Sequence, residues 1–439
     1  MNLLHFTYNL IGTGVGLPLI APLWLRCRNH PEERERLRQR LGWYPSGIAD
    51  HLGTGPRVWL HAVSVGEVGV ADAIADALTA RMPHCRIAVS TTTRQGLAQA
   101  RARLKDRAAS FYAPLDLIGP TGKALDMVRP NVLALLETEL WPNLIIKARR
   151  MGTRIAVLNG RISVRSIRRY LRIRPLMRLA LDHIDAFSMI SQDDAARILS
   201  IGADPKRVHV HGNAKFDSPD PLAGDHLKKA SDWAAKLYGL TANDAVFVAG
   251  STRDPEEAIV LEAFARLRRE FPRAVLILAP RHITRCPQVE QYVRQKGLAC
   301  QRRTQLNTES SGRNGPVVLL DTIGELNATY SVADFVFCGG SLVPKGGQNL
   351  LEPAVWAKPV MYGPSMEDFA DARRLIESAG GGCTVRDAGE MTAAAAEWLR
   401  RPEKARAAGQ AARRAILSHR GASHRHAGVV AQLLQTSGV

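Results

Sequence analysis

The sequence predicts an α/β protein with two doubly wound, Rossmann-like parallel sheets that face a central cleft. Short apolar runs recur along the chain, and each ends in a turn rich in Gly, Ser, Thr, Arg or Glu that opens a helix. The pattern breaks at a proline-bearing stretch, residues 217–225, and then restarts. A chain of 439 residues is also too long for one core. We therefore expect an anchor over residues 1–28, a first domain over 29–217 and a second over 218–439.

The composition narrows the classes of partner. A net charge of +18 indicates a polyanion: nucleic acid, anionic lipid or a phosphorylated substrate. The six cysteines form no CxxC pair, so a reducing compartment without structural zinc is expected. No Walker loop and no GxGxxG follows a predicted strand, which disfavours an ATPase or a dehydrogenase. No DxD pair occurs, so the usual carboxylate clamp on a metal–diphosphate is missing.

The N-terminal segment is apolar. No charged residue occurs between Leu3 and Leu25, a length that just reaches what a bilayer requires. Six arginines against three glutamates follow between Arg26 and Arg40, which by the positive-inside rule keeps the rest of the chain in the cytoplasm. We predict an uncleaved anchor that spans the membrane or lies in its interface. The alternative is a buried helix of the first domain.

The first domain is predicted from its apolar strands. They are Val58–Val63, Arg86–Ser90, Val132–Leu136, Arg154–Leu158, Ala186–Ile190 and Val208–His211. Glu67 follows the first strand at a helix start, where it is either catalytic or a favourable first-turn carboxylate. Glu137 and Glu139 follow the strand that ends at Leu136. Alternate residues of an extended chain point to opposite sides, so at most one of these two is expected to face a given site.

A basic segment closes the first half. Seven arginines lie between Arg161 and Arg178, interleaved with apolar residues and Tyr170. This pattern is typical of contact with a membrane surface or with phosphate groups. A merely solvated basic face is the alternative.

The second domain restarts the pattern with strands Ala245–Ala249, Ala274–Ala279 and Val317–Leu320, separated by a polar loop over 301–316. The most informative stretch then runs from Cys338 to Pro364: a strand ending at Cys338, a glycine-rich loop, a helix opening near Gly347 and a strand from Pro359. The pairs Gly339-Gly340 and Gly346-Gly347 flank Lys345, so main-chain amides could approach an anion. Asn349 and Glu352 share one helix face. We predict a nucleotide site, with amides for the phosphate and a carboxylate for the ribose.

Several of these motifs together resemble the Kdo (3-deoxy-D-manno-octulosonic acid) transferase family. They are His61–Glu67 (HAVSVGE), Glu137–Asn143 (ETELWPN), Asn159–Ser163 (NGRIS), Gly212–Asp217 (GNAKFD), Ala279–His282 (APRH) and the Gly339–Pro353 run. The resemblance extends from the anchor to about Phe369. It implies a GT-B fold and an inverting transfer of Kdo from CMP-Kdo to the lipid A precursor (lipid IVA). The reaction would take place at the cytoplasmic side of the inner membrane, beside an anionic surface, with no metal, no cofactor and no nucleic acid.

The resemblance also implies residue roles. Glu67 matches the general base, and Glu137 or Glu139 is expected in the cleft. The donor CMP-Kdo would contact Ser251, Arg281, His282, Gly340, Ser341, Lys345, Gly347, Asn349 and Glu352. The acceptor would contact Ser64, Gly66, Arg161, Arg165, Arg168, Arg169 and Arg172. Two positions depart from the family pattern: Gln348 replaces a histidine, and Glu367-Asp368 stands where an asparagine is usual.

Two other functions compete with this one. The first is a GT-B glycosyltransferase or epimerase that uses a UDP-sugar. The second is a membrane-tethered, basic nucleic-acid-binding protein, although aromatic residues are few and no helix-turn-helix or RNA-binding motif occurs.

Overall fold

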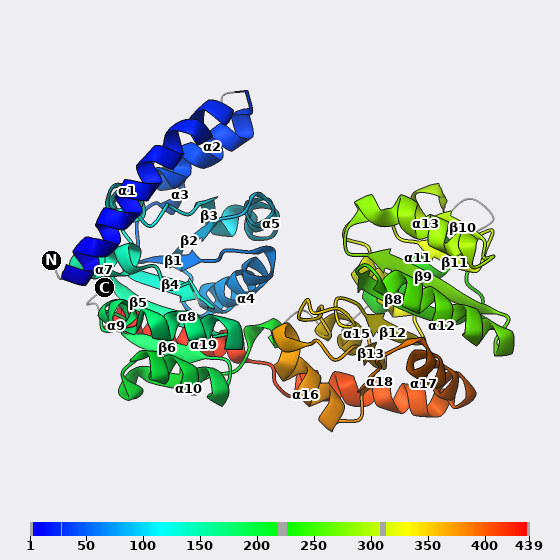
Figure 1. Ribbon diagram of the computed structural model, residues 1–439. Helices are drawn as coiled ribbons and strands as arrows, with labels where there is room; N and C mark the ends of the chain where they lie inside the picture. The colour runs from blue at the N-terminus through cyan, green and yellow to red at the C-terminus, as the bar shows by residue number, and fades with distance from the viewer. Residues whose placement is uncertain (1–2, 28, 138, 218–225, 308–312, 437–439) are drawn as a thin grey trace. The chain divides into compact units, whose positions relative to one another are not determined.

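The computed structural model describes residues 3–27, 29–137, 139–217, 226–307 and 313–436 (Figure 1). The chain forms two compact units, residues 1–218 with 419–439, and residues 219–418. Each unit is built on one seven-stranded, all-parallel sheet. The prediction of two parallel α/β sheets is therefore confirmed. Because parallel strands need crossover helices, both faces of each sheet are covered.

The first sheet has the strand order β3-β2-β1-β4-β5-β6-β7. Its strands are β1 (Arg57–His61), β2 (Arg86–Thr91), β3 (Ala108–Tyr112), β4 (Val132–Leu136), β5 (Arg154–Gly160), β6 (Ala186–Met189) and β7 (Val208–Val210). Its helices are α1 (Leu3–Arg26), α2 (Pro31–Arg40), α3 (Ser46–Leu52), α4 (Val65–Arg81), α5 (Arg94–Leu104), α6 (Ile118–Val128), α7 (Pro142–Arg150), α8 (Val164–Arg172), α9 (Arg174–Leu181), α10 (Gln192–Ile201) and α19 (Ala422–Gln435). Strand β3 has no counterpart among the predicted strands.

Two cores cover the faces of this sheet, and the alternation of strand residues separates them. Trp59 and Leu133 belong to one core, whereas Val58 and Leu60 belong to the other. All four side chains are fully buried. This double burial explains why the strands read as unbroken apolar runs.

The second sheet has the order β10-β11-β9-β8-β12-β13-β14. Its strands are β8 (Ala245–Thr252), β9 (Ala274–Pro280), β10 (Cys300–Arg302), β11 (Val317–Leu319), β12 (Phe335–Cys338), β13 (Val360–Tyr362) and β14 (Gly382–Thr384). Its helices are α11 (His226–Leu237), α12 (Glu256–Glu270), α13 (Cys286–Gln295), α14 (Leu326–Thr329), α15 (Leu351–Val355), α16 (Ala370–Ser378), α17 (Ala388–Arg400) and α18 (Pro402–Leu417). The polar stretch 301–316 was expected to be a loop, but its start forms β10, which pairs with β11.

The terminal helix corrects the expected division of the chain. The second domain was expected to run to residue 439, but α19 belongs to the first unit. Val430 and Leu434 of α19 are buried in the core that also holds Val58 and Leu60. Asp217 accepts hydrogen bonds from the main-chain amides of Gly421 (2.6 Å) and Ser423 (2.5 Å), which satisfies free donors at the start of α19. Burial of the apolar face of α19 and this cap at its start together explain why the C-terminal helix packs on the first unit.

Helix α1 has two unlike sides. His5 and Asn9 are buried, and the His5 ring bonds Asn143 at the start of α7 (2.7 Å). Tyr8 donates to Asp116 (2.8 Å) on the same side. Leu3, Phe6, Leu10 and Ile11 are exposed. Within the described residues, no helix is both long enough and apolar enough to span a bilayer.

Candidate active site

The candidate catalytic residues lie where the first sheet changes direction. Strand β1 pairs with β2 on one side and with β4 on the other, so the crossovers run in opposite directions from the β1–β4 junction. Ligands of open α/β sheets bind outside the carboxyl ends of the strands at such a point. The turn after β1 leads to Glu67, and the turn after β4 holds Glu137 and Glu139. The sheet topology therefore brings the three predicted carboxylates to one edge.

Glu67 caps its own helix. Its main-chain amide donates to the Ser64 hydroxyl (3.4 Å), and its carboxylate accepts from the Ser64 hydroxyl (2.9 Å) and from the amide of Val63 (2.8 Å). This reciprocal arrangement resembles a capping box, with the amide of Val63 in place of the N-cap amide, so Glu67 does stabilise the start of α4. Burial, together with the nearby charge of Glu137, nevertheless raises the pKa of Glu67 to about 7. A carboxylate with this pKa is suited to accept a proton at neutral pH.

Glu137 and Glu139 both influence Glu67. Strand β4 ends at Leu136, and Glu137 takes a left-handed conformation (φ +54°), so the alternation of an extended chain stops there. The charges of both residues raise the pKa of Glu67. The alternation that predicted only one of them at the site therefore does not apply to Glu137, and which of the two faces the site stays a prediction. Burial raises the pKa of Glu139 to about 7, although Trp141 donates a hydrogen bond to its carboxylate (2.8 Å).

Lys215 offsets part of this negative charge. Its Nζ lies 2.7 Å from Oε1 of Glu137, and both side chains are mostly buried. Asn159, at the end of β5, accepts a hydrogen bond from the amide of Ala214 and holds the Lys215 loop next to the sheet edge. Lys215 was not among the predicted site residues. Its signal was present in the Gly212–Asp217 motif, but its partner is 78 residues away and the sequence does not reveal it.

The predicted acceptor residues lie in two places: two at the start of α4, and the arginines after β5 and on α8. Ser64 caps α4, and the exposed Gly66 lies in the first turn of that helix, beside Glu67. Arg161 follows β5 directly. Arg168, Arg169 and Arg172 are exposed on α8. The side chain of Arg165 lies outside the described residues.

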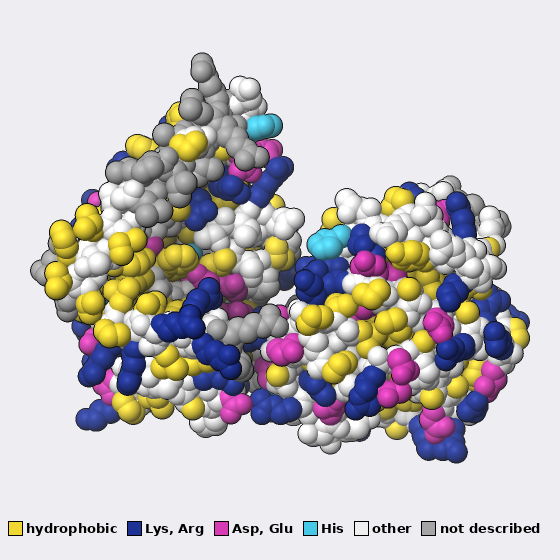
Figure 2. Space-filling view, viewed as in Figure 1, with side chains coloured by type: hydrophobic (Ala, Val, Ile, Leu, Met, Phe, Trp, Pro, Cys, Tyr) yellow, Lys and Arg dark blue, Asp and Glu magenta, His cyan; other side chains and the backbone are white. Residues whose placement is uncertain are grey.

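Helix α8 is basic on its exposed side and packs against the core of the first unit on its other side. Among the residues that the structure describes, no carboxylate forms an ion pair with Arg168, Arg169 or Arg172. Tyr170 packs against the core, where burial and the charge of Glu139 raise the pKa of its hydroxyl. Figure 2 shows Lys and Arg side chains gathered over α8 and hydrophobic side chains over the N-terminal half of α1. A polyanion at α8 would therefore meet unpaired guanidinium groups close to the carboxylates.

The donor candidates follow three adjacent strands of the second sheet. Strand β8 lies between β9 and β12, so the turns after these strands share one edge, and the strand order again reverses there. Ser251, the second-last residue of β8, has a left-handed backbone (φ +57°), and Arg281 and His282, after β9, are exposed. Lys345 is exposed in the loop after β12. Asn349 donates to Glu352 (3.0 Å), although Asn349 precedes α15 and does not share a helix face with Glu352 as predicted.

The predicted cradle of main-chain amides is wrong. The amides of Gly340, Ser341 and Leu342 donate to the carboxylate of Glu256 at 2.6, 2.9 and 2.8 Å, so they do not face an external phosphate. The amide of Gly347 donates to the carbonyl of Gly340 (2.8 Å). Helix α15 begins at Leu351 rather than near Gly347 and has only five residues. The amides of both glycine pairs are therefore occupied within the protein, since that of Gly339 donates to Gly250 and that of Gly346 to the hydroxyl of Ser365.

Two other predicted donor residues shape the loop from inside. Ser341 is fully buried, and its hydroxyl donates to the carbonyl of Cys338 (2.5 Å) and accepts from the amide of Gly363 (2.8 Å). Gly347 has φ +81°, and a Cβ there would collide with the sulfur of Met366. Only glycine fits both constraints. The two departures from the family pattern line the same loop: Gln348 lies against Gly340, and Asp368 lies against Gly346.

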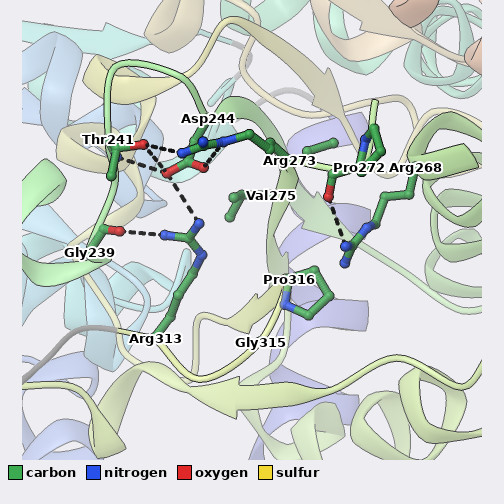
Figure 3. A pocket seen from close by; sticks show the side chains of 11 residues that line it. Gly239, Thr241, Asp244, Arg268, Pro272, Arg273, Val275, Arg313, Gly315 and Pro316 are labelled. Carbon is green, nitrogen blue, oxygen red and sulfur yellow. Dashed lines mark hydrogen bonds and ion pairs between the residues drawn. The ribbon is translucent and has the colours of Figure 1, made fainter. Parts of the chain in front are cut away.

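A hollow of about 400 Å³ lies at the other edge of the second sheet (Figure 3). Ala274 and Val275, at the amino end of β9, help to line it together with three arginines. Arg268 donates to the carbonyl of Pro272, Arg273 to Thr241, and Arg313 to the carbonyl of Gly239 and to Asp244. These guanidinium groups already bind acceptors of the protein. The hollow is also remote from the carboxyl ends of the strands, so it is not the active-site candidate.

Comparisons with known proteins agree on one family. Residues 35–218 match the family model of 3-deoxy-D-manno-octulosonic-acid transferases. The transferase of that name from Bordetella pertussis is 33% identical over 381 residues, which cover 84% of this chain and 85% of the relative. The one from Haemophilus influenzae is 29% identical and covers 90% of both chains. A bifunctional glycosyltransferase/methyltransferase from Fusobacterium nucleatum is 36% identical over 323 residues, and the match spans only 49% of its length.

Solved structures match the fold of most of the chain. UDP-GlcNAc 2-epimerase from Neisseria meningitidis, solved with UDP-GlcNAc bound, has a TM-score of 0.60 at 12% identity over 87% of this chain and 100% of the epimerase. HepE from Anabaena, solved with UDP and glucose, has a TM-score of 0.57 at 14% identity, again over 87% of this chain and 100% of that one. At these identities the likeness shows a GT-B-like fold.

Proposed function

Because the chain belongs to the Kdo transferase family, we propose that it transfers Kdo from CMP-Kdo to a lipid A precursor at the cytoplasmic face of the inner membrane. The chain is a glycosyltransferase of lipopolysaccharide synthesis. The observation that most directly supports a mechanism is the group of three carboxylates at the carboxyl edge of β1 and β4. Within that group the pKa of Glu67 is about 7.

We propose Glu67 as the general base. The acceptor hydroxyl attacks the anomeric carbon of Kdo and gives its proton to the Glu67 carboxylate. The bond between that carbon and the phosphate oxygen breaks, and CMP leaves with the electron pair. Attack from the face opposite the leaving group inverts the configuration. A base is most effective when its pKa lies near the working pH, which fits a value of about 7.

We assign donor recognition to the edge formed by β8, β9 and β12. The carboxylate of Glu352, oriented by the hydrogen bond from Asn349, would accept hydrogen bonds from the ribose hydroxyls. Because the amides of both glycine pairs are occupied, we assign the phosphate to cationic side chains. Lys345 and Arg281 are exposed on the loops after β12 and β9. A group that stabilises the charge developing on the leaving phosphate accelerates its departure.

A UDP-sugar enzyme is the alternative, and nucleotide protection separates the two. We expect 1 mM CMP to raise the unfolding temperature of the protein and 1 mM UDP to leave it nearly unchanged, since only a bound ligand stabilises the fold. The measurement is thermal unfolding followed by tryptophan fluorescence. Protection by UDP and not by CMP would contradict the proposed donor.

We propose that α8 binds the phosphates of the acceptor. Replacing Arg168, Arg169 and Arg172 together by serine is expected to raise the acceptor KM by about 5- to 10-fold and to weaken its salt dependence, because three exposed guanidinium groups are lost. Donor KM should not change. The measurement is initial rate against acceptor concentration at two salt concentrations.

A matched control removes the same charge elsewhere. Arg269, Arg406 and Arg414 are exposed on the second unit, and their triple serine variant should behave as wild type. If that control loses as much acceptor affinity as the α8 variant, the effect belongs to net charge and not to α8. A change confined to donor KM would also overturn the assignment.

We propose that α1 lies in the membrane interface with its exposed apolar side toward the lipid. The side chains of Leu10 and Ile11 are 62% and 61% exposed, while His5 and Tyr8 attach the other side of the helix to the first unit. The double substitution Leu10→Ser and Ile11→Ser is expected to lower the fraction bound to anionic vesicles several-fold, since apolar burial drives interfacial binding. Vesicle flotation measures this fraction. The control is Ile323→Ser, which removes an 85% exposed side chain from the second unit, and equal losses in both variants would refute the role of α1.

A further inference from the structure

Glu256 is a fully buried carboxylate at the start of α12, next to the donor edge of the second sheet. It belongs to none of the motifs that suggested the function. A buried carboxylate is costly unless its oxygens accept several hydrogen bonds. Four main-chain amides supply them. Arg253 donates from the turn after β8 (2.8 Å), and Gly340, Ser341 and Leu342 donate from the loop after β12.

These bonds join two segments that are 84 to 86 residues apart in the chain. The turn after β8 and the loop after β12 approach closely here, since a Cβ on Gly339 would lie 2.5 Å from Cα of Thr252. Such a close approach leaves little room for the loop to adopt another conformation. The carboxylate takes the place that a phosphate occupies in anion-binding loops, so the loop already holds its anion as part of the protein.

The hydrogen bonds continue from this loop to the donor candidates. Gly340 accepts from the amide of Gly347, which fixes the second glycine pair against the first. The carbonyl of Ser341 accepts from the amide of Ser365 (2.9 Å), and the hydroxyl of Ser365 accepts from the amide of Gly346 (3.0 Å). Both sets of hydrogen bonds end on Gly346 and Gly347. Lys345 precedes these two glycines, and the Asn349–Glu352 pair follows them.

We propose that Glu256 is a positioning residue of the donor site. It touches no substrate, and it acts by holding the loop 339–347 so that Lys345 and the Asn349–Glu352 pair keep the geometry that binds the nucleotide. This inference rests on the proposed function for the identity of the donor. The internal fixation of the loop does not depend on it.

The first test compares kinetic constants of Glu256→Gln. Glutamine has nearly the same size, but an NH₂ group replaces one of the two oxygens. Because an NH₂ group cannot accept from a main-chain N–H, some of the four hydrogen bonds are lost. We expect donor KM to rise roughly 10- to 100-fold, as for the loss of one or two charge-assisted bonds, and acceptor KM to stay within about twofold. A variant that merely loses stability would not raise donor KM while leaving acceptor KM unchanged. The control is Asp334→Asn. It removes a carboxylate that accepts a hydrogen bond from the main-chain amide of Val246 at the other edge of the sheet, and it should leave donor KM unchanged.

The second test needs no variant and no donor. In the wild-type protein without nucleotide, the amides of residues 340–342 should exchange with solvent as slowly as those of the neighbouring strands β8 and β12, and CMP should add no protection. Fast exchange that CMP then slows would show that these amides bind the nucleotide phosphate, which would overturn the proposal. Unchanged donor KM in Glu256→Gln would overturn it as well. If the donor is not CMP-Kdo, the exchange measurement on the free protein still decides the role of Glu256.

Discussion

Glu67→Gln is expected to lower turnover by roughly 10²- to 10⁴-fold while donor KM stays within about twofold. Glutamine keeps one oxygen that can accept a hydrogen bond from Val63 or Ser64, and the Ser64 cap is unchanged, so the start of α4 should stay intact. It has nearly the same size, but it cannot accept the proton of an attacking hydroxyl. Steady-state rates with saturating donor and acceptor measure the effect. Near-normal turnover would leave Glu67 with its capping role alone.

The pH dependence provides a second readout of the same residue. A base works when ionised, so wild-type turnover should rise with pH through about 7 and then level off. Glu139, whose pKa is also about 7, titrates in the same range, and the midpoint therefore belongs to the cluster. The residual activity of Glu67→Gln should lose this rise. Retention of the full rise in the variant would assign the titration to another group.

The same pKa values predict how stability depends on pH. The carboxyls of Glu67 and Glu139 have folded-state pKa values raised from 4.5 to about 7, so the folded protein holds more protons than the unfolded chain between these values. The free energy of unfolding should therefore fall as pH rises from about 4.5 to about 7. In Glu67→Gln this fall should be smaller, because one of the two groups is gone. Denaturant unfolding at pH 5 and pH 8 measures the difference.

Lys215→Met is expected to lower turnover at pH 7 by about 5- to 10-fold and to move the midpoint of the pH profile up by about one unit. Loss of the cation leaves the charge of Glu137 uncompensated beside Glu67, which favours the protonated form of Glu67. Removal of one partner from a mostly buried ion pair should also cost about 1–3 kcal/mol of stability, discounted for the partial exposure of both side chains. Rate profiles from pH 5.5 to 9 measure the shift.

Two controls isolate the charge of Lys215. Lys215→Arg keeps the cation and should keep the midpoint. The double variant Lys215→Met with Glu137→Gln removes both charges, so its midpoint should return toward the wild-type value, a coupling that a double-mutant cycle detects. An upward shift that persists in the double variant would show that Glu137 does not transmit the effect.

Much of the fold could be predicted because its strands are buried on both faces. Runs such as Val132–Leu136 and Ala274–Pro280 are apolar throughout, and the turns after them carry the polar residues. Strand β14 (Gly382–Thr384) was missed because it has only three residues and one of them is glycine. The return of α19 to the first unit was missed because its buried face, with Val430 and Leu434, gives no sign of which sheet it covers.

The sequence predicts at which strand ends the candidate residues lie, but not their contacts with one another. The placement of Glu67, Glu137 and Glu352 in the segments that follow β1, β4 and β12 is predictable from the order of strands and helices. The partners of these segments are not, because the bonds from Glu256 to residues 340–342 and from Lys215 to Glu137 join segments far apart in the chain. Two glycine pairs were read as an open cradle for phosphate, whereas the amide of Gly339 donates to the carbonyl of Gly250 and those of residues 340–342 donate to the buried carboxylate of Glu256.

The central claim is the transfer of Kdo to a lipid A precursor, and the mass of the product tests it most directly. Purified protein is incubated with CMP-Kdo and a tetra-acylated precursor in anionic vesicles, and the lipid is analysed by mass spectrometry. We expect the precursor to gain the mass of one or more Kdo residues with wild-type protein, and almost none with Glu67→Gln in the same time. An unchanged precursor with CMP-Kdo, or a gain of mass only when a UDP-sugar is the donor, would contradict the account.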